Sequence, residues 1–489
     1  MTKKKNKIEQ RKRVGKTLKS HFSQLPNSSF SSWKDDFLPN ILWAACLRGN
    51  LDQETALNLF RQVVSRFRER FNNRNDVSLC HDNLAHIANE DFDYVFQDLF
   101  GDKQASKLLR PLALIDSLPD INHWRRAFSD VEDNDIEWNV IAAAMMATLD
   151  HQSQEATDIR WLKVISFCVI GRLRIPETMA DELRLYPDEG DQRKVRPTIR
   201  AAEMSLRNFE TGSERSVSIE PMEIEPFWRE LLGKTSCVQI QTPFSPAPNP
   251  AAVQKEISYS IDAIRKHFMN NLESTSVDAK MDGAFGICLY ATNLCFEVSI
   301  SPSQQMAGGR ILLRSIVESF ITLSYLVKKD DLTLWRQYRN YGAGQTALAF
   351  IKTSDADEWP AFVNLERLEM LANEDVWHEM RDIDLGSWAN SDLRKMSEFA
   401  GVKDVYDKYY DWASGFSHGH WGCVRDTTLT TCLNPLHRLH RIPTGLSQMP
   451  SVLEDCCKIS NRIIDLLNGL YPTIKRRIDW SKEVEKDKP

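Results

Sequence analysis

Polar side chains at helical spacing interrupt two apolar stretches in the second half of this 489-residue chain. One stretch places Arg314 and Glu318 four residues apart, and the other does the same with Ser414 and His418. Residues four apart lie on one face of a helix, so each pair is expected to point in one direction. A guanidinium binds phosphate well, and an imidazole exchanges protons near neutral pH. These residues indicate a polar site within a helical bundle.

Apolar neighbours surround Arg314 and Glu318 on nearly every side of the expected helix, which predicts at least partial burial of the pair. Buried charges are costly unless they are paired and hydrogen-bonded. Two interpretations follow. The pair is either a structural ion pair that orients the bundle, or part of a functional site.

The segment around Ser414 and His418 also has two interpretations. A Ser–His pair suggests nucleophilic catalysis, but neighbours on one helix rarely reach triad geometry, and no G-x-S-x-G turn is present. His418 and His420 offer two nitrogens to a metal, yet no H-E-x-x-H accompanies them. We therefore expect no metal and no cofactor. The groups either line a polar site or only form hydrogen bonds at a helix end.

The first residues of the chain are strongly basic. Residues 1–30 are expected to form a solvated arm, either a simple soluble tail or a segment that contacts phosphates, because clustered cations bind polyanions by releasing counterions. The expected nucleic-acid contacts are Lys3, Lys4, Lys5, Arg11 and Arg13.

Composition and periodicity favour an all-α protein with two helical domains. Hydrophobic residues make up 42% of the chain, and apolar positions recur at helical intervals with almost no alternating, strand-like pattern. We expect the following boundaries: a basic arm over 1–30, a helical domain over 31–185, a charged and Pro-rich connector over 186–250, an up-and-down helical bundle over 251–475, and a charged tail over 476–489.

The remaining composition predicts a cytoplasmic protein with no membrane association. The net charge of −6 is mild, no run of 18 apolar residues occurs, and no apolar segment follows the basic N-terminus. The ten cysteines are scattered without a C-x-x-C, which suggests free thiols in a reducing compartment.

Aromatic residues are frequent in the second half, including the run Trp335–Tyr341, which contains Tyr338. They are expected to pack in the bundle, or alternatively to form a surface on which bases stack.

The two polar stretches resemble signatures of a bacterial family of unknown function with HEPN-like helical bundles. In that family a helix with Arg-x-x-x-Glu precedes a Trp/Tyr-rich helix, and a Tyr…Ser…His segment follows, matched here by Tyr410, Ser414 and His418. The resemblance covers about residues 255–470 and implies RNA binding or cleavage, often in toxins and phage defence, and frequently a homodimer. Carried over by motif position, the site residues are Arg314, Glu318, Tyr338, Ser414 and His418.

The chain departs from the active pattern of many HEPN ribonucleases, Arg–x(4–6)–His, which is missing from its C-terminal half. The spacing occurs once, at Arg74 and His81, and this is the alternative catalytic pair. Two hypotheses remain open: an RNA-binding or RNA-cleaving protein, and a non-catalytic scaffold in which the polar residues form a structural network. A solvent-reachable cluster favours the first, whereas dry burial with every polar atom satisfied favours the second.

Overall fold

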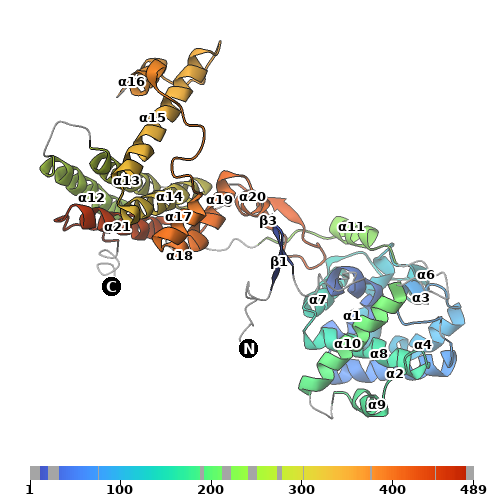
Figure 1. Cartoon of the computed structure of the whole chain (residues 1–489). Helices are drawn as coiled ribbons and strands as arrows, with labels where there is room; N and C mark the ends of the chain where they lie inside the picture. The colour runs from blue at the N-terminus through green and yellow to red at the C-terminus, as the bar shows by residue number, and fades with distance from the viewer. Residues whose placement is uncertain are drawn as a thin grey trace, which may run out of the picture. The chain divides into compact units, whose positions relative to one another are not determined.

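The computed structural model (Figure 1) divides into two compact units, each of which is described by itself. Unit 1 comprises Met1–Ile240 and Thr431–His440, and unit 2 comprises Gln241–Thr430 and Arg441–Pro489. The structure describes residues 11–19, 32–74, 76–187, 192–211, 222–239, 250–272, 278–300, 302–374, 377–445 and 448–480.

Unit 1 is a helical domain built around one fully buried helix. Its helices are α1 (Leu42–Asn50), α2 (Gln53–Phe71), α3 (His81–Leu84), α4 (Asn89–Gly101), α5 (Lys103–Leu109), α6 (Ile121–Ala127), α7 (Asp135–Thr148), α8 (Gln154–Val169), α9 (Glu177–Arg184), α10 (Gln192–Thr211) and α11 (Ile224–Lys234), with shorter turns η3 (Trp33–Phe37), η4 (Leu38–Ile41) and η5 (Arg110–Leu114). Every residue from Leu42 to Arg48 in α1 is buried. Helices α2, α5, α7 and α8 pack against α1.

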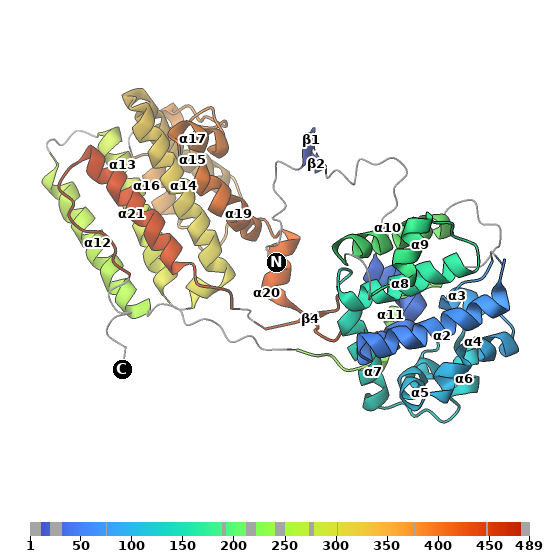
Figure 2. The same cartoon turned by 90° about the horizontal axis from the view of Figure 1, so that it is seen from below.

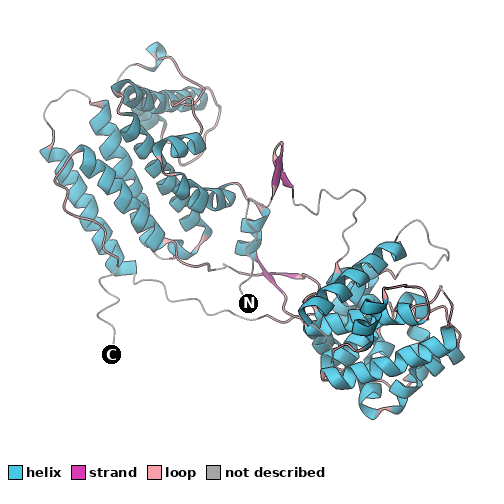
Figure 3. Cartoon of the chain, turned by 60° about the horizontal axis from the view of Figure 1, so that its bottom comes forward, coloured by secondary structure: helices cyan, strands magenta, loops and turns pink. Residues whose placement is uncertain are grey.

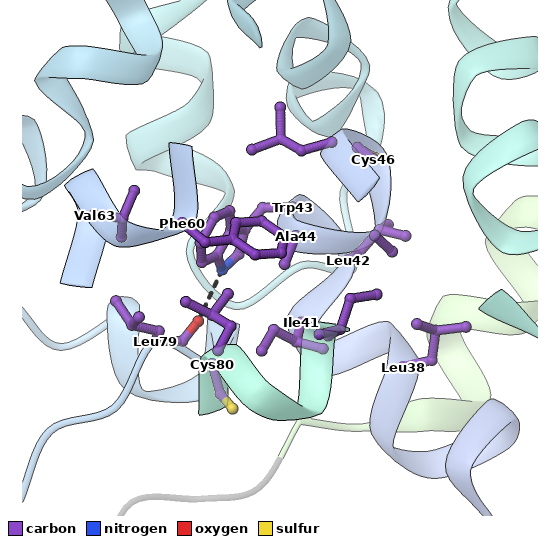
Figure 4. Close-up of a cluster of buried hydrophobic side chains, with 14 of the residues drawn as sticks. Leu38, Ile41, Leu42, Trp43, Ala44, Cys46, Phe60, Val63, Leu79 and Cys80 are labelled. Atoms are coloured by element: carbon purple, nitrogen blue, oxygen red, sulfur yellow. Dashed lines mark hydrogen bonds between the residues drawn. The ribbon is translucent and has the colours of Figure 1, made fainter. Parts of the chain in front are cut away.

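Trp43 shows how the core of unit 1 combines apolar packing with hydrogen-bond satisfaction. Its indole packs edge-on against Phe60 and Phe96. The indole N–H donates to the backbone carbonyl of Leu79 at 2.8 Å, so the one polar atom of the side chain has a partner (Figure 4). The α1 helix is thereby fixed to the segment that precedes α3.

A buried polar network crosses the same unit. The carboxylate of Asp158 on α8 is fully buried and accepts hydrogen bonds from Arg48 at 2.7 Å and from the hydroxyl of Tyr186 at 2.5 Å. Gln53 adds a third donor at 3.0 Å. The buried Asp158 carboxylate is tolerated because both of its oxygens accept hydrogen bonds, one of them from the cation Arg48.

Unit 2 is a helical bundle (Figure 2). Its helices are α12 (Pro250–Asn270), α13 (Ala279–Ser299), α14 (Ala307–Lys329), α15 (Leu332–Ser354), α16 (Leu365–Ala372), α17 (Leu393–Ala400), α18 (Lys403–Val405), α19 (Asp411–Ser417), α20 (Trp421–Thr428) and α21 (Leu453–Leu470), with shorter turns η6 (Ser303–Gln305), η7 (His378–Met380) and η8 (Tyr406–Tyr410). Helix α14 is central because α13, α17, α19 and α21 all pack against it.

The all-α prediction is confirmed, since the described strands form only two short pairs (Figure 3). Strands β1 (Lys12–Val14) and β2 (Thr17–Lys19) form an exposed antiparallel hairpin, and β3 (Leu429–Thr431) pairs with β4 (Arg441–Pro443). None of the helices in the described ranges combines the length and hydrophobicity that a membrane span requires.

The expected connector over 186–250 differs from the structure. It contains α10 and α11, both part of unit 1. Helix α10 buries Glu203, which pairs with Arg160 and Lys163 of α8, so part of its charge belongs to the interior rather than to a solvated linker. Weak alternation of apolar residues in the sequence also predicts a short strand over 216–224, but residues 216–221 lie outside the described residues.

The other boundaries shift less. The arm over 1–30 is described only at 11–19, where it forms the β1–β2 hairpin. The bundle is expected over 251–475, whereas unit 2 comprises Gln241–Thr430 and Arg441–Pro489, and residues 431–440 belong to unit 1. The expected tail begins with ordered chain, because Ile478 is buried and its backbone N–H donates to Asn461 at 2.9 Å.

The Asp158 network predicts a large loss of stability when the carboxylate is removed. Asp158→Ala leaves Arg48 buried without its closest counter-charge, which should lower the free energy of unfolding by about 3 to 5 kcal/mol. Urea denaturation followed by circular dichroism measures the change. The matched control is Asp93→Ala, which breaks an exposed pair with Arg126 and should cost about 1 kcal/mol or less. Equal losses for the two variants would contradict the assignment.

Candidate functional site

The first half of α14 carries Arg310, Arg314 and Glu318, and of these Arg310 has a structural role. Its side chain is buried, and its guanidinium donates to the backbone carbonyls of Gln304 and Met306, each at 3.2 Å, and to that of Pro450. Arg310 therefore ties the beginning of α14 to the chain ahead of α21. It is not exposed to a ligand.

Arg314, one turn further along α14, lies at the edge of the bundle. Its Nη2 lies 2.9 Å from a carboxylate oxygen of Glu318 and donates to the hydroxyl of Tyr410 at 3.2 Å. Its Nη1 faces the hydroxyl of Ser417 at 3.4 Å. The guanidinium carbon also lies 5.2 Å from the centroid of the Tyr410 ring, within the range of a cation–π contact.

The pair is only partly buried. The side chain of Arg314 is 21% exposed and that of Glu318 is 34% exposed. The Nε of Arg314 is buried and has no hydrogen-bond partner among the described residues. A guanidinium with one open edge and an unsatisfied donor resembles a ligand site more than a closed structural network.

Electrostatics keep Arg314 charged. Burial opposes its charge, but the hydrogen bond with Tyr410 and the charge of Glu318 outweigh that effect and raise the pKa of Arg314. The neighbouring Tyr406 stacks on Tyr410 with ring centroids 4.9 Å apart. Burial, followed by the negative charge of Asp411, raises the pKa of Tyr406, so this ring remains a neutral hydrogen-bonding group.

Tyr410, which accepts a hydrogen bond from Arg314, lies in a short turn of π-helix. Residues Tyr406–Tyr410 form a π-helical turn before α19 begins at Asp411. Tyr409 in the same turn donates instead to Asp455 of α21 at 2.9 Å, so neighbouring tyrosines hold different helices. Such π-turns are frequent at functional sites because they change which side chains share a face.

Two glycines position His418 and His420 after α19. Gly419 has φ +60°, a left-handed conformation that turns the chain into α20. Gly415 lies so close to α20 that an added Cβ would be 2.7 Å from the sulfur of Cys423 and 3.5 Å from Nδ1 of His420. The two imidazoles are exposed, with ring centroids 6.0 Å apart.

Exposed aromatic rings flank these histidines. Trp412 on α19 is 55% exposed and Trp421 at the start of α20 is 61% exposed. The ring of Trp412 lies over Gly422, because a Cβ there would be 3.6 Å from the indole. Large rings held at the surface by neighbouring backbone offer faces for stacking.

The structure joins some of the expected site residues and separates others. Arg314 and Glu318 form the expected pair, but the hydroxyl that meets Arg314 belongs to Ser417 rather than Ser414. His418 follows Ser417 directly, although no hydrogen bond or ion pair among the described residues joins it to Arg314. Tyr338 packs edge-on against Trp388 at 5.1 Å, and burial raises its pKa.

Tyr410 and Ser417 were absent from the expected site. Tyr410 stood in the Tyr…Ser…His pattern, and Ser417 lies seven residues later, two helical turns away and on the same face. That spacing was the signal in the sequence. In a regular helix the four-residue spacing favours Ser414 as the partner of His418, whereas the π-helical turn at Tyr406–Tyr410 interrupts that regular winding.

The alternative pair, Arg74 and His81, does not form a common site. His81 is fully buried, and its Nδ1 lies 2.9 Å from the carboxylate of Asp120. Arg74 is exposed and donates through Nε to Asp76 at 3.0 Å. Burial of the imidazole beside a carboxylate indicates a structural hydrogen bond.

The expected basic contacts are only partly described. Lys3, Lys4 and Lys5 lie outside the described residues. Arg11 and Arg13 are exposed at the β1–β2 hairpin, and Arg13 donates to the backbone carbonyl of Gly15 at 3.2 Å.

A second polar feature of unit 2 is an open basic cavity of about 410 Å³ between α12 and the chain after α21. Lys266, His267, Lys475 and Arg476 contribute to its lining. Two of these groups already have partners, because Arg476 donates to Glu256 at 3.0 Å and His267 bonds to a backbone carbonyl at 2.8 Å. Fewer of the basic groups in the cavity are therefore available to a ligand than the lining residues alone would indicate.

Comparison with known proteins concerns unit 2 alone. Residues 285–429 match the model of a family described as "Family of unknown function (DUF5677)". Searches of curated proteins and of solved structures gave no match. The matched segment contains Arg314, Glu318, Tyr410, Ser417 and His418, whereas Arg74 and His81 lie outside it. The polar cluster at the edge of the bundle thus falls within the part of the chain that is similar to this family.

Proposed function

We propose that unit 2 binds RNA at a surface formed by Arg314, Tyr410, Trp412, Ser417, His418, His420 and Trp421, here called the Arg314 surface. The observation that carries the proposal is the partly exposed guanidinium of Arg314, held between Tyr410 and Ser417. Helix α19, which carries Ser417, and the following helix α20 also carry the exposed indoles of Trp412 and Trp421. Arginine binds phosphate through a planar set of donors, and exposed indoles stack on bases.

Each group has a role in this proposal. Arg314 contacts a phosphate oxygen, which competes with Glu318 for the same guanidinium. Tyr410 and Ser417 orient the guanidinium by hydrogen bonds, so little side-chain freedom is lost on binding. Trp412 and Trp421 supply stacking faces from two consecutive helices.

RNA cleavage is the catalytic form of the same proposal. His418 would transfer a proton to or from the reacting ribose or leaving oxygen, while Arg314 would stabilise charge on the phosphate. The resemblance of the bundle to HEPN-like families supports this reaction class. The same resemblance leads us to propose a cytoplasmic homodimer that acts in phage defence or a stress response. Tyr338 and Ser414 have no part in it, since the contacts of Arg314 run to Tyr410 and Ser417.

The competing proposal is a scaffold whose polar residues only fix the bundle. Arg310 fits that description, because it is buried and bonded to three carbonyls. Arg314 fits it less well, because its side chain remains 21% exposed and one of its nitrogens lacks a partner among the described residues.

Loss of the guanidinium should weaken RNA binding. Arg314→Ala is expected to reduce affinity for single-stranded RNA by about 10-fold or more, since a charged hydrogen bond contributes about 1.5 to 3 kcal/mol. The slope of log affinity against log salt should fall by about 1. Fluorescence anisotropy at several salt concentrations measures both quantities.

The matched control is Arg265→Ala, which removes an exposed arginine paired with Asp262 on the same helix, α12. It should leave affinity and salt slope unchanged. Equal effects of the two variants would assign binding to general charge rather than to the Arg314 surface.

The exposed indoles should contribute through stacking. Trp412→Ala and Trp421→Ala are each expected to weaken RNA binding by about 1 to 3 kcal/mol without changing the salt slope. Trp377→Ala is the control, because its indole is 67% exposed elsewhere in unit 2. Unchanged affinity in both test variants would remove base stacking from the proposal.

Cleavage should depend on His418 while binding does not. If the wild-type protein cleaves RNA, His418→Ala should slow single-turnover cleavage by about 10² to 10⁴, the usual contribution of an acid–base group. His151→Ala is the control, since that imidazole is exposed in unit 1. An unchanged cleavage rate would exclude His418 as the proton-transfer group, and a lowered melting temperature would indicate a structural role.

A further inference from the structure

Four side chains that can bind a metal meet in unit 1, and none of them belongs to the Arg314 surface of unit 2. Cys237 follows the end of α11, whereas Cys432, His437 and His440 lie in the short segment Thr431–His440 that belongs to unit 1. Their donor atoms all lie within 4.8 Å of one another. We propose that these residues form a structural zinc site of the Cys2His2 type.

Backbone contacts bring the two segments together. The N–H of Leu433 donates to the carbonyl of Val238 at 2.8 Å, and the N–H of Val238 faces the sulfur of Cys432 at 3.4 Å. Within the second segment, the N–H of Cys432 donates to the carbonyl of His440 at 2.9 Å, which closes a loop around His437. The four candidate ligands therefore lie on two chain segments that are hydrogen-bonded to each other.

The donor separations suit one tetrahedral ion. The sulfur of Cys237 lies 3.7 Å from Nδ1 of His437 and 3.5 Å from Nδ1 of His440. The sulfur of Cys432 lies 3.2 Å from Nδ1 of His437. Zinc–sulfur and zinc–nitrogen bonds of about 2.3 and 2.0 Å place tetrahedral S and N ligands about 3.6 Å apart.

The far nitrogen of His437 already has partners, as expected of a zinc-bound imidazole. Its Nε2 lies 2.8 Å from the hydroxyl and 3.2 Å from the carbonyl of Thr235. A proton on Nε2 donated to this carbonyl leaves the lone pair of Nδ1 directed toward the two sulfurs. The side-chain nitrogen of Asn434 lies 3.5 Å from the same Nε2 and donates to the backbone carbonyl of Ser236 at 2.8 Å. Such outer contacts fix the orientation of zinc ligands.

The chemistry of the ligands favours zinc and a structural role. Two sulfurs and two imidazoles in a tetrahedral arrangement select zinc over the oxygen-seeking Mg²⁺ and Ca²⁺. All four positions are filled by protein, which is typical of structural rather than catalytic sites. Cys432 and His437 are buried, whereas Cys237 is exposed, so the ion can enter from one side.

The site would strengthen the attachment of the segment Thr431–His440 to the rest of unit 1. Besides its hydrogen bonds to the chain after α11, Leu436 is buried in the core of unit 1, and Arg438 pairs with Asp35 at 2.8 Å. A zinc ion would also link Cys237 to residues about two hundred positions later in the chain. Metal binding to a folded chain contributes directly to its stability.

The test is the metal content of the full-length, tag-free protein. After incubation with Zn²⁺ and removal of the excess, mass spectrometry of the metal should find about one zinc per chain. Cys432→Ser and Cys237→Ser/His440→Ala should retain about a tenth of that amount or less. Substitution by Co²⁺ should give the visible absorption of tetrahedral cobalt–thiolate in the wild type and none in these variants.

The controls are Cys168→Ser and His151→Ala, which change a cysteine and a histidine of unit 1 outside the cluster and should keep the zinc. The double variant alters the two more exposed ligands, so circular dichroism should show a retained fold. A zinc content of the wild type no higher than that of a buffer blank, or zinc retained in the double variant, would overturn the proposal. A Cys237–Cys432 disulfide in the untreated protein, shown by a loss of two free thiols, would overturn it as well.

Discussion

A guanidinium at the rim of an apolar bundle must be paired, and this constraint organises the candidate site of unit 2. Helix α14 buries Ile316, Val317 and Phe320 against its neighbours. This face fixes the rotation of the helix, so Arg314 is carried to the edge and cannot turn fully into water. Its charge is then satisfied by Glu318 on the same helix and by hydroxyls from the π-turn and α19.

The comparison between Arg310 and Arg314 separates structure from function. One turn of helix divides them, yet Arg310 is closed in by three carbonyls, whereas Arg314 keeps an exposed edge. Burial and satisfaction of every donor are typical of a structural arginine. An incompletely satisfied arginine beside exposed histidines and indoles is a better candidate for ligand binding.

Unit 1 uses polar groups in two further ways. Asp158 and Glu203 are charges that the interior tolerates because buried cations and hydroxyls surround them. The donor atoms of Cys237, Cys432, His437 and His440 instead all lie within 4.8 Å of one another. The proposed zinc ion would bind all four of these groups together.

The sequence by itself determined the fold class and most of the helices. Apolar periodicity in the sequence predicts helices over 281–299 and 331–353, and the structure has α13 at Ala279–Ser299 and α15 at Leu332–Ser354. The agreement is close because periodicity and capping residues act over short distances. The same local logic predicted the Arg314–Glu318 pair. Local patterns were not enough for the segment 186–250, which is rich in charged residues like a solvated linker. Composition does not show that one of these charges, Glu203, is buried and paired with Arg160.

Only the tertiary structure decided which distant residues meet. The choice of Ser417 over Ser414 depends on the π-turn and on how α19 packs on α14, neither of which follows from residue spacing. The fourth member of the Cys/His cluster, Cys237, comes from the chain after α11, so Cys432, His437 and His440 alone matched no recognised spacing. Helix formation is decided by neighbours in the chain, whereas a site is decided by long-range packing.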